Sequence, residues 1–323
     1  MKFFLGACLA ALVCASARAG GDDFSFHFPA RQPAVYSVEM KINTSTTMSA
    51  NSRDVNITSK SDVRFKFQLL ALGPSSNGIV AVSYKPYDFE GDWDTINASG
   101  RILSTLRGYD VRATQNGILL YDSQRGIGMG QADKARRDMI NIFLSGTVDF
   151  DSSGDFKSAQ GDVPFVYFFN DQKKKQEDFF DLVFPRHLIK AGDGWQKVIT
   201  KNSVGGDIKL DIGLSYTNNY TRAADIMTNG ESVATFELAS TANVADQTGY
   251  YEQPGQNVSL SISQYSHDAS GVFHFDTGRG LMVDDESTTK DDFDYAALIQ
   301  EKSLTGHTIV SDETTLQLLS PGE

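Results

Sequence analysis

Apolar side chains recur at every second residue along most of this chain, and this alternation limits the possible fold more than any other feature. Residues two apart lie on the same face of a strand, so each such segment buries one face and exposes the other. The pattern predicts a mainly β protein. The expected strands are Val35–Met48, Asp62–Leu69, Ile79–Tyr84, Asp110–Thr114, Ile118–Tyr121, Asp207–Tyr220, Ser232–Ala242, Val258–Tyr265, Val272–Phe275 and Thr305–Leu319.

The composition agrees with a fold of many turns and few helices. The chain has 31 Asp against 10 Glu, and Asp favours turns and helix caps whereas Glu favours helix interiors. Apolar residues at helical spacing predict helices only over Gln131–Leu144 and Lys173–Phe184, with a weaker candidate over Phe293–Gln300.

Residues 1–19 have the three parts of a cleaved export signal. Lys2 supplies a positive charge, residues 3–13 form a short apolar run, and Ala17-Arg18-Ala19 places small residues where a signal peptidase reads. The run is too short to span a membrane, and a buried N-terminal core helix is the alternative. We expect cleavage after Ala19 and a periplasmic or secreted protein.

Removal of this signal changes the cysteine content and the charge. Cys8 and Cys14 leave with it, so the mature chain has no disulfide and no thiol, which favours a bacterial envelope. Loss of Lys2 and Arg18 takes the formal net charge from −12 to −14. Such an acidic chain disfavours nucleic acid and anionic membranes as partners. We expect no nucleic-acid partner, cofactor or bound metal, and no transmembrane segment in the mature chain.

One short segment is repeated. Gly117–Ile127 aligns without gaps on Gly271–Leu281, and the offset of 154 residues is about half of the mature chain. We therefore expect two duplicated, strongly curved antiparallel β halves, residues 20–160 and 161–323, with a few covering helices. The identical positions are Gly117, Asp122, Arg125 and Gly126 in the first copy and Gly271, Asp276, Arg279 and Gly280 in the second.

In both copies a strand ends at the Asp and another begins after Arg-Gly. Such an Asp accepts hydrogen bonds from turn amides, and the Gly allows the positive φ that a tight turn requires. We interpret the motif as a structural turn. An Asp–Arg pair that binds a ligand in each half is the alternative.

A strand, then Phe-Asp-x-x-x-Gly-Leu at residues 275–281, then another strand resembles the turn of exported bacterial proteins of the lipoprotein-carrier-like, half-barrel type. Phe184-Pro185 followed by Gly192-Asp193-Gly194-Trp195 is similar to an FP…GDxW signature of bacterial exported families without an assigned activity. The resemblance covers the middle and the second half of the chain. It implies a strongly curved antiparallel sheet in each half, with helices across the concave face, and it implies no catalytic residue.

Aromatic residues are concentrated in the middle of the chain. One interpretation is that they seal the junction between the halves, and the other is that they line an apolar groove for a lipid or peptide segment. The candidate ligand-binding residues are Phe165, Phe168, Phe179, Phe180 and Phe184.

Three further motifs are weak. Gly126-Ile-Gly128-Met-Gly130 lacks the spacing of a dinucleotide loop and is expected to be a strand-to-helix connection. Asp149–Asp155 resembles the start of a calcium loop, but Gln160 replaces the bidentate carboxylate, which favours a hairpin turn. A carboxylate pair for glycoside chemistry would have to come from the acidic run Asp285, Glu286, Asp292 and Asp294.

These features favour an exported, non-enzymatic binding or scaffolding protein of the bacterial envelope. Its partner would be an apolar ligand on a concave sheet face, or an envelope protein. The alternatives are a hydrolase of envelope polymers and a purely structural interaction module. Carboxyl groups with raised pKa in a cleft would favour the enzyme, and an apolar concave pocket would favour the carrier.

Overall fold

The computed structural model describes residues 22–50, 53–73, 78–140, 146–161, 182–203, 209–228, 231–244, 247–253, 256–299 and 302–320. The expected signal peptide and its cleavage site lie outside these residues, as do Phe165, Phe168, Phe179 and Phe180. The strands are β1 (Ala34–Ala50), β2 (Arg53–Ala71), β3 (Ile79–Asn97), β4 (Gly100–Arg107), β5 (Asp110–Gln115), β6 (Ile118–Asp122), β7 (Gly146–Asp151), β8 (Phe156–Gly161), β9 (Gly194–Ser203), β10 (Lys209–Arg222), β11 (Ile226–Thr228), β12 (Glu231–Val244), β13 (Gln247–Gln253), β14 (Gln256–Asp276), β15 (Leu281–Ile299) and β16 (Lys302–Leu318), and the helix is α1 (Met129–Ile140).

The strands form one large antiparallel sheet, which confirms the mainly β, curved class that the alternation predicts. The order along its main path is β6-β5-β4-β3-β2-β1-β16-β15-β14-β12-β10-β9. Near the two ends of the chain, β1 pairs with β16, from Tyr36 opposite Leu318 to Ala50 opposite Leu304. Strands from both expected halves therefore share one sheet, and the division into residues 20–160 and 161–323 stays a prediction.

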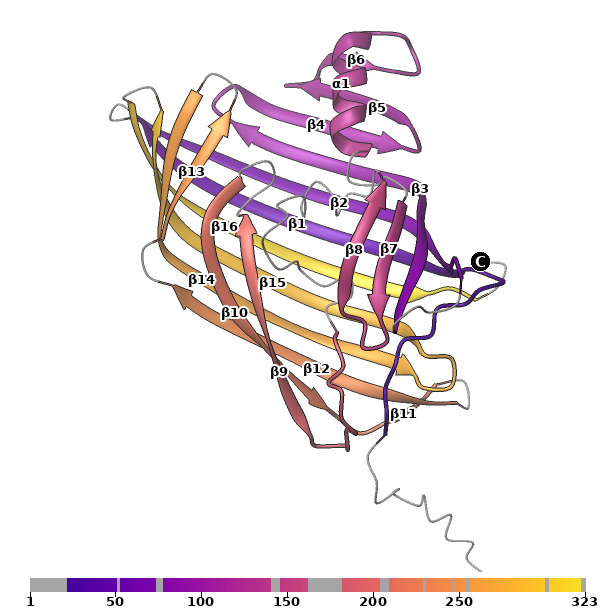
Figure 1. The fold of residues 1–323 in the computed structure, drawn as a ribbon. Helices are drawn as coiled ribbons and strands as arrows, with labels where there is room; N and C mark the ends of the chain where they lie inside the picture. The colour runs from indigo at the N-terminus through magenta and orange to yellow at the C-terminus, as the bar shows by residue number, and fades with distance from the viewer. Residues whose placement is uncertain are drawn as a thin grey trace, which may run out of the picture.

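The sheet forks at β3. Residues Ile79–Tyr84 of this strand pair with β7, whereas Glu90–Asn97 pair with β4. One branch continues to β6 and the other ends at β8. Figure 1 shows β7 and β8 folding in front of the long strands from one side, and β9 and β10 from the other, so that the sheet curves around an interior.

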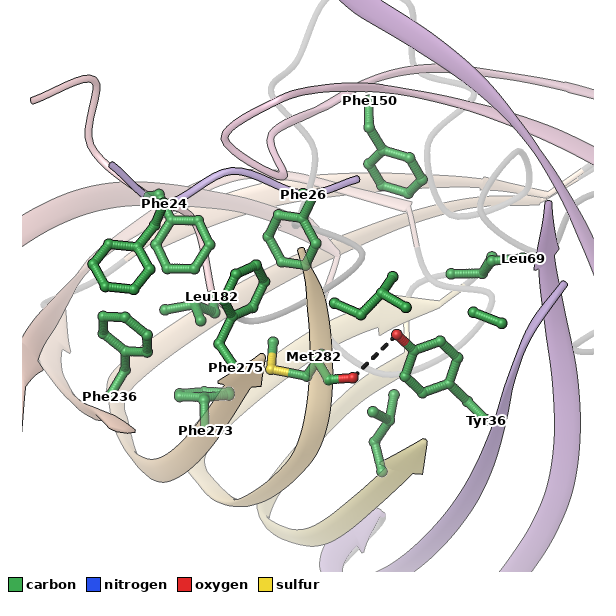
Figure 2. Close-up of a cluster of buried hydrophobic side chains, with 14 of the residues drawn as sticks. Phe24, Phe26, Tyr36, Leu69, Phe150, Leu182, Phe236, Phe273, Phe275 and Met282 are labelled. Atoms are coloured by element: carbon green, nitrogen blue, oxygen red, sulfur yellow. Dashed lines mark hydrogen bonds between the residues drawn. The ribbon is translucent and has the colours of Figure 1, made fainter. Parts of the chain in front are cut away.

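A core of apolar side chains fills one end of the concave face (Figure 2). Alternate residues of neighbouring strands supply it, such as Val38 of β1 opposite Leu316 of β16. The segment before β1 adds Phe24 and Phe26, and each such ring contributes about 2–3 kcal/mol when it leaves water. The largest fully buried members include Tyr36, Leu69, Phe150, Leu182, Tyr220, Phe236, Phe273 and Phe275.

Charged side chains lie on the convex face of the same sheet, together with exposed apolar ones such as Leu103 and Val272. Glu39 of β1, Arg64 of β2 and Glu90 of β3 lie side by side in register, and Arg64 contacts Glu39 at 3.2 Å. On β3 and β4, Arg107 donates to both oxygens of Asp92 at 2.9 Å. Exposed ion pairs of this kind add little stability. The side chains of these pairs are partly exposed.

Of the three expected helices, one is confirmed, one is wrong and one lies almost wholly outside the described residues. The first expected helix is confirmed by α1, which packs on β5 and β6 (Figure 1). The weaker candidate is wrong, because Phe293–Ile299 is the end of β15 and pairs with β14 and β16. Pairing on both sides outweighs the helix propensity of its Ala and Leu residues. Of the expected helix Lys173–Phe184, only Leu182–Phe184 is described, and it is not helical.

Strand β14 is continuous where the alternation predicts two segments, Val258–Tyr265 and Val272–Phe275. Between them, the residues on the concave face are His267, Ala269 and Gly271, in register with β12 and β15. These side chains are too small or too polar to continue the apolar alternation. The lapse in the pattern therefore marks a change in the lining of the concave face.

Candidate functional site

Phe184 is the one predicted ligand-binding residue that lies within the described part, and it is packed in the core. Its ring centroid is 4.9 Å from that of Phe275 and 5.3 Å from those of Phe24 and Phe236. Its exposed fraction is 3%. Phe184 is therefore part of the packed aromatic core at this end of the concave face.

The segment before β1 is fixed over the core by polar contacts. Asp22 and Ile189 exchange two backbone hydrogen bonds of 2.9 Å. The buried guanidinium of Arg222 donates to Asp22 Oδ2 at 2.8 Å, to Asp225 Oδ1 at 2.9 Å and to the Ile189 carbonyl at 2.9 Å. The protein's own side chains thus occupy the aromatic end of the concave face.

The two repeated turns share one side-chain-to-backbone hydrogen bond. Asp122 Oδ1 accepts from the backbone N–H of Arg125 at 3.1 Å, and Asp276 Oδ1 accepts from that of Arg279 at 2.9 Å. In each turn the Arg side chain also contacts the Asp carboxylate. These contacts are internal to the turns, so they serve the fold without a ligand.

The glycines of the repeat differ in their surroundings. Gly126 and Gly280 close the two turns with φ of 68° and 67°. Gly117 lies in the β5–β6 turn with φ of 80°, whereas Gly271 lies inside β14. The equivalence therefore holds for the Asp-to-Gly turns, and the internal duplication stays a prediction.

The calcium-like segment forms the hairpin turn between β7 and β8. Asp151 Oδ1 accepts hydrogen bonds from the backbone N–H groups of Ser153 at 2.9 Å and Asp155 at 3.2 Å. Lys157 contacts both carboxylates, and Lys197 of β9 contacts Asp155 at 2.9 Å. The ammonium groups of Lys157 and Lys197 therefore contact the carboxylate oxygens of Asp151 and Asp155 that a calcium ion would need as ligands.

The acidic run on β15 does not converge into one cleft. Alternate residues of a strand face opposite sides, so Asp285 lies buried on the concave face while Glu286, Asp292 and Asp294 lie on the convex face. There His307 contacts Asp294 at 2.8 Å and Asp292 at 3.5 Å. The described residues contain no group of three or more His, Cys, Asp or Glu suited to a metal ion.

Carboxyl groups with a raised pKa would have favoured the hydrolase. Burial raises the pKa of Asp151, Asp155 and Asp276, but hydrogen bonds and ion pairs with Lys, Arg or turn residues lower each pKa by more. These carboxyl groups are therefore ionised at neutral pH and do not provide a general acid.

Beyond the core, the side chains of the concave face become small or polar. Strand register places Ser240, Ala269 and Thr289 in one row across β12, β14 and β15. In the next row Gly271 and Ser287 lie beside the buried Leu238, and the Phe273 ring packs over Gly271. The polar belt is defined as Asn218, Ser240, His267, Ala269, Gly271, Ser287, Thr289 and Asp291. Past it, a smaller aromatic group begins with Tyr265 and Phe293, whose rings are 6.2 Å apart.

The belt contains a tightly held histidine. His267 Nδ1 lies 2.7 Å from Asp291 Oδ1, which also accepts a 2.7 Å hydrogen bond from the Tyr265 hydroxyl. The Tyr216 ring stacks on the imidazole, with centroids 4.1 Å apart and 26° between the planes. Tyr216 lies on β10 and His267 on β14, with β12 between these two strands. The β12 residue opposite His267 is Ala242, whose small side chain leaves room for the two rings to meet. The His267 side chain is 2% exposed.

Two buried polar atoms of the belt have no hydrogen-bond partner in the described part of the chain. They are His267 Nε2 and Asn218 Oδ1. Because an ionised carboxylate only accepts, the His267 Nδ1 that faces Asp291 carries a proton, and in the neutral form of the ring Nε2 is then an acceptor. A buried acceptor without a partner costs about 1–3 kcal/mol. A hydrogen-bond donor on a ligand, or an ordered water, would supply the missing partner of each.

The sequence interpretation missed His267 and Asp291, which are 24 residues apart and meet only through the β14–β15 register. The signal that would have found them is the lapse of apolar alternation at residues 266–271.

Two open hollows lie on the convex face. Their volumes are about 420 Å³ and 480 Å³. Charged and apolar side chains line both of them, with Trp93 and Leu103 among the apolar residues of the first and Val272 among those of the second. The charged lining residues are Lys41, Lys60, Asp62, Asp92 and Asp94 in the first hollow and Glu237, Glu286 and Glu313 in the second.

No family model matches the chain, and no curated protein matches it. Matching solved structures include a Bacteroides fragilis protein described as exported with a YmcC-like fold (8% identity, 88% of this chain and 97% of that chain, TM-score 0.21). Others are an outer membrane channel from Pseudomonas putida (8%, 91% and 98%, TM-score 0.21) and the transport unit of an Escherichia coli autotransporter (6%, 92% and 94%, TM-score 0.25). Similarity at this level assigns neither a ligand nor an activity.

The lipoprotein-carrier-like resemblance is not supported by these comparisons, and the helix found in the described residues does not lie across the concave face, as the resemblance implied. In the described residues the helix lies on β5 and β6, and the concave face is covered by the segments around Phe24 and Phe184. None of the helices in that part of the chain has both the length and the apolar character needed to cross a bilayer.

Proposed function

We propose that this chain is an exported, non-enzymatic binding protein of the bacterial envelope that holds its ligand on the concave face of the sheet, at the polar belt. The observation that carries this proposal is the contrast along one face. Large aromatic side chains fill the end of the face at the core, whereas the belt has smaller side chains and the unpartnered acceptors of His267 and Asn218. Two further buried polar atoms without a partner in the described part of the chain, Arg222 Nε and Thr235 Oγ1, lie outside the belt.

The surroundings of the belt fit a ligand with an apolar part. Val310 of β16 lies on the concave face next to Asp291 of the belt, and Met40 and Ile42 of β1 lie one strand further on, beyond Thr314 and Asp312 of β16. The three apolar side chains are each only partly buried. An alkyl chain laid against them would bury further apolar area, at about 25 cal/mol per Å². The ligand is therefore amphiphilic, with its polar group at the belt.

The experiment is native mass spectrometry of the mature protein purified from a bacterial envelope. Ala269 lies on the concave face and Ser270 next to it is exposed on the convex face, so Ala269→Phe and Ser270→Phe form a matched pair. The wild type and Ser270→Phe should carry the same added mass, and Ala269→Phe should lose it while its circular dichroism is unchanged. A wild type without any added mass, which also takes up no amphiphile, would overturn the proposal in favour of the structural interaction module.

A further inference from the structure

We infer that His267 is the anchor of the ligand's polar group and that this group is a hydrogen-bond donor, a hydroxyl or an amide N–H. The inference rests on the proposed function and adds the chemistry of the ligand. Its starting point is that His267 Nε2 is buried without a partner among the described residues.

The chemistry of the pair selects a donor. In the neutral ring the proton lies on Nδ1, 2.7 Å from the Asp291 carboxylate, and Nε2 then offers a lone pair. A ligand oxygen without hydrogen, such as an ester carbonyl, has nothing to donate to it. A fatty-acid carboxylate would in addition lie near the negative charge of Asp291. A hydroxyl or amide N–H satisfies Nε2 and adds no charge.

The ring is held in one orientation before any ligand arrives. Asp291 fixes Nδ1, the Tyr265 hydroxyl holds the same carboxylate oxygen, and Tyr216 stacks on the ring face. A fixed acceptor loses little entropy on binding and therefore favours one ligand geometry. The other unpartnered acceptor of the belt, Asn218 Oδ1, lies on β10, two strands from His267.

Paired probes test the inference on the mature protein after its own ligand has been extracted. A monoacylglycerol carries hydroxyl donors, and the methyl ester of the same fatty acid carries none. The wild type should bind the monoacylglycerol about tenfold more tightly, the factor that one hydrogen bond of about 1.4 kcal/mol supplies. His267→Gln should keep the preference, because its amide can donate to Asp291 and still offer an oxygen. His267→Phe should bind both probes equally.

The outcomes separate the two proposals. If the wild type binds both probes equally, or if His267→Phe keeps the preference, the inference is overturned and the binding function stands. If neither probe binds any of the three proteins, both proposals are overturned. Melting curves of both variants establish that they are folded before binding is compared.

A spectroscopic readout excludes a merely structural histidine. The ¹⁵N resonance of His267 Nε2, identified by its loss in His267→Gln, should shift when the monoacylglycerol is added and stay in place with the methyl ester. A resonance that already shows a hydrogen-bonded Nε2 in the ligand-free protein, and that neither probe moves, would mean that water satisfies the atom. That result would overturn the inference.

Discussion

Tyr36 of β1 and Met282 of β15 are joined by a hydrogen bond that passes across the strand between them (Figure 2). The tyrosine hydroxyl donates to the Met282 carbonyl at 3.2 Å, although the residues are 246 apart in sequence. Both residues have an exposed fraction of 0%. The bond therefore joins the first strand of the chain to one of its last strands inside the core.

Tyr36→Phe should lower the free energy of unfolding by about 1–2 kcal/mol, because it keeps the ring and leaves the buried Met282 carbonyl without its donor. Denaturant unfolding followed by circular dichroism measures the change. Tyr109→Phe is the control, since Tyr109 is 68% exposed, and it should have almost no effect. Equal effects of the two substitutions would show that the hydroxyl does not matter in the core.

Phe184→Ala should cost about 3–5 kcal/mol of stability, because Phe184 packs among four other phenylalanines and its removal leaves a cavity. Leu188→Ala removes a side chain that is 55% exposed and should cost far less. A small cost at Phe184 accompanied by weaker ligand binding would mean that this residue is a lid and not part of a seal.

Stability should fall in acid through the turn between β7 and β8. Hydrogen bonds from Ser153 and Lys157 outweigh burial and hold the pKa of Asp151 below its ordinary value of about 3.9. A lowered folded-state pKa stabilises above the unfolded pKa, and this contribution is lost as the pH falls through the folded one. Unfolding free energies measured between pH 7 and pH 3 should therefore decline less steeply in Asp151→Asn than in the wild type. Equal slopes of unfolding free energy against pH in the two proteins would show that Asp151 does not contribute to the acid sensitivity.

Calcium should leave the protein almost unchanged. Lys157 and Lys197 already hold Asp151 and Asp155, so the ion would have to displace them. Millimolar calcium added to a chelated sample should not move the unfolding midpoint. Binding at 1,000 times the dissociation constant would stabilise by about 4 kcal/mol, and a shift of several degrees that Asp151→Ala abolishes would contradict this assignment.

The class of the fold follows from the sequence because alternation is local. The alternation in Val35–Met48 and in Thr305–Leu319 predicts a strand in each segment, and these strands are β1 and β16 respectively. Their mutual pairing is not visible in the sequence, since it joins residues more than 250 positions apart. The helix expected at Phe293–Gln300 failed for the same reason, because strand pairing with distant partners overrode the local propensity.

The candidate site was harder to predict than the fold. Of the five phenylalanines expected to bind ligand, Phe184 lies in the packed core and the others lie outside the described residues. Aromatic density in a sequence indicates burial, but it does not distinguish a filled core from an open groove. His267 and Asp291 are single polar residues in long strands, and only the register shows that they meet.

Thiol protection tests most directly whether the polar belt holds a ligand. Both cysteines of the chain, Cys8 and Cys14, lie in the expected signal peptide, so a mature variant with one introduced cysteine has a single reactive site. The rate of maleimide labelling would be compared before and after extraction of the ligand in Ala269→Cys, on the concave face, and in Ser270→Cys, on the convex face. Extraction of the ligand should speed labelling at position 269, and added monoacylglycerol should slow it again. The labelling rate at position 270 should not change. Labelling at position 269 that neither treatment alters would contradict the proposed binding at the belt.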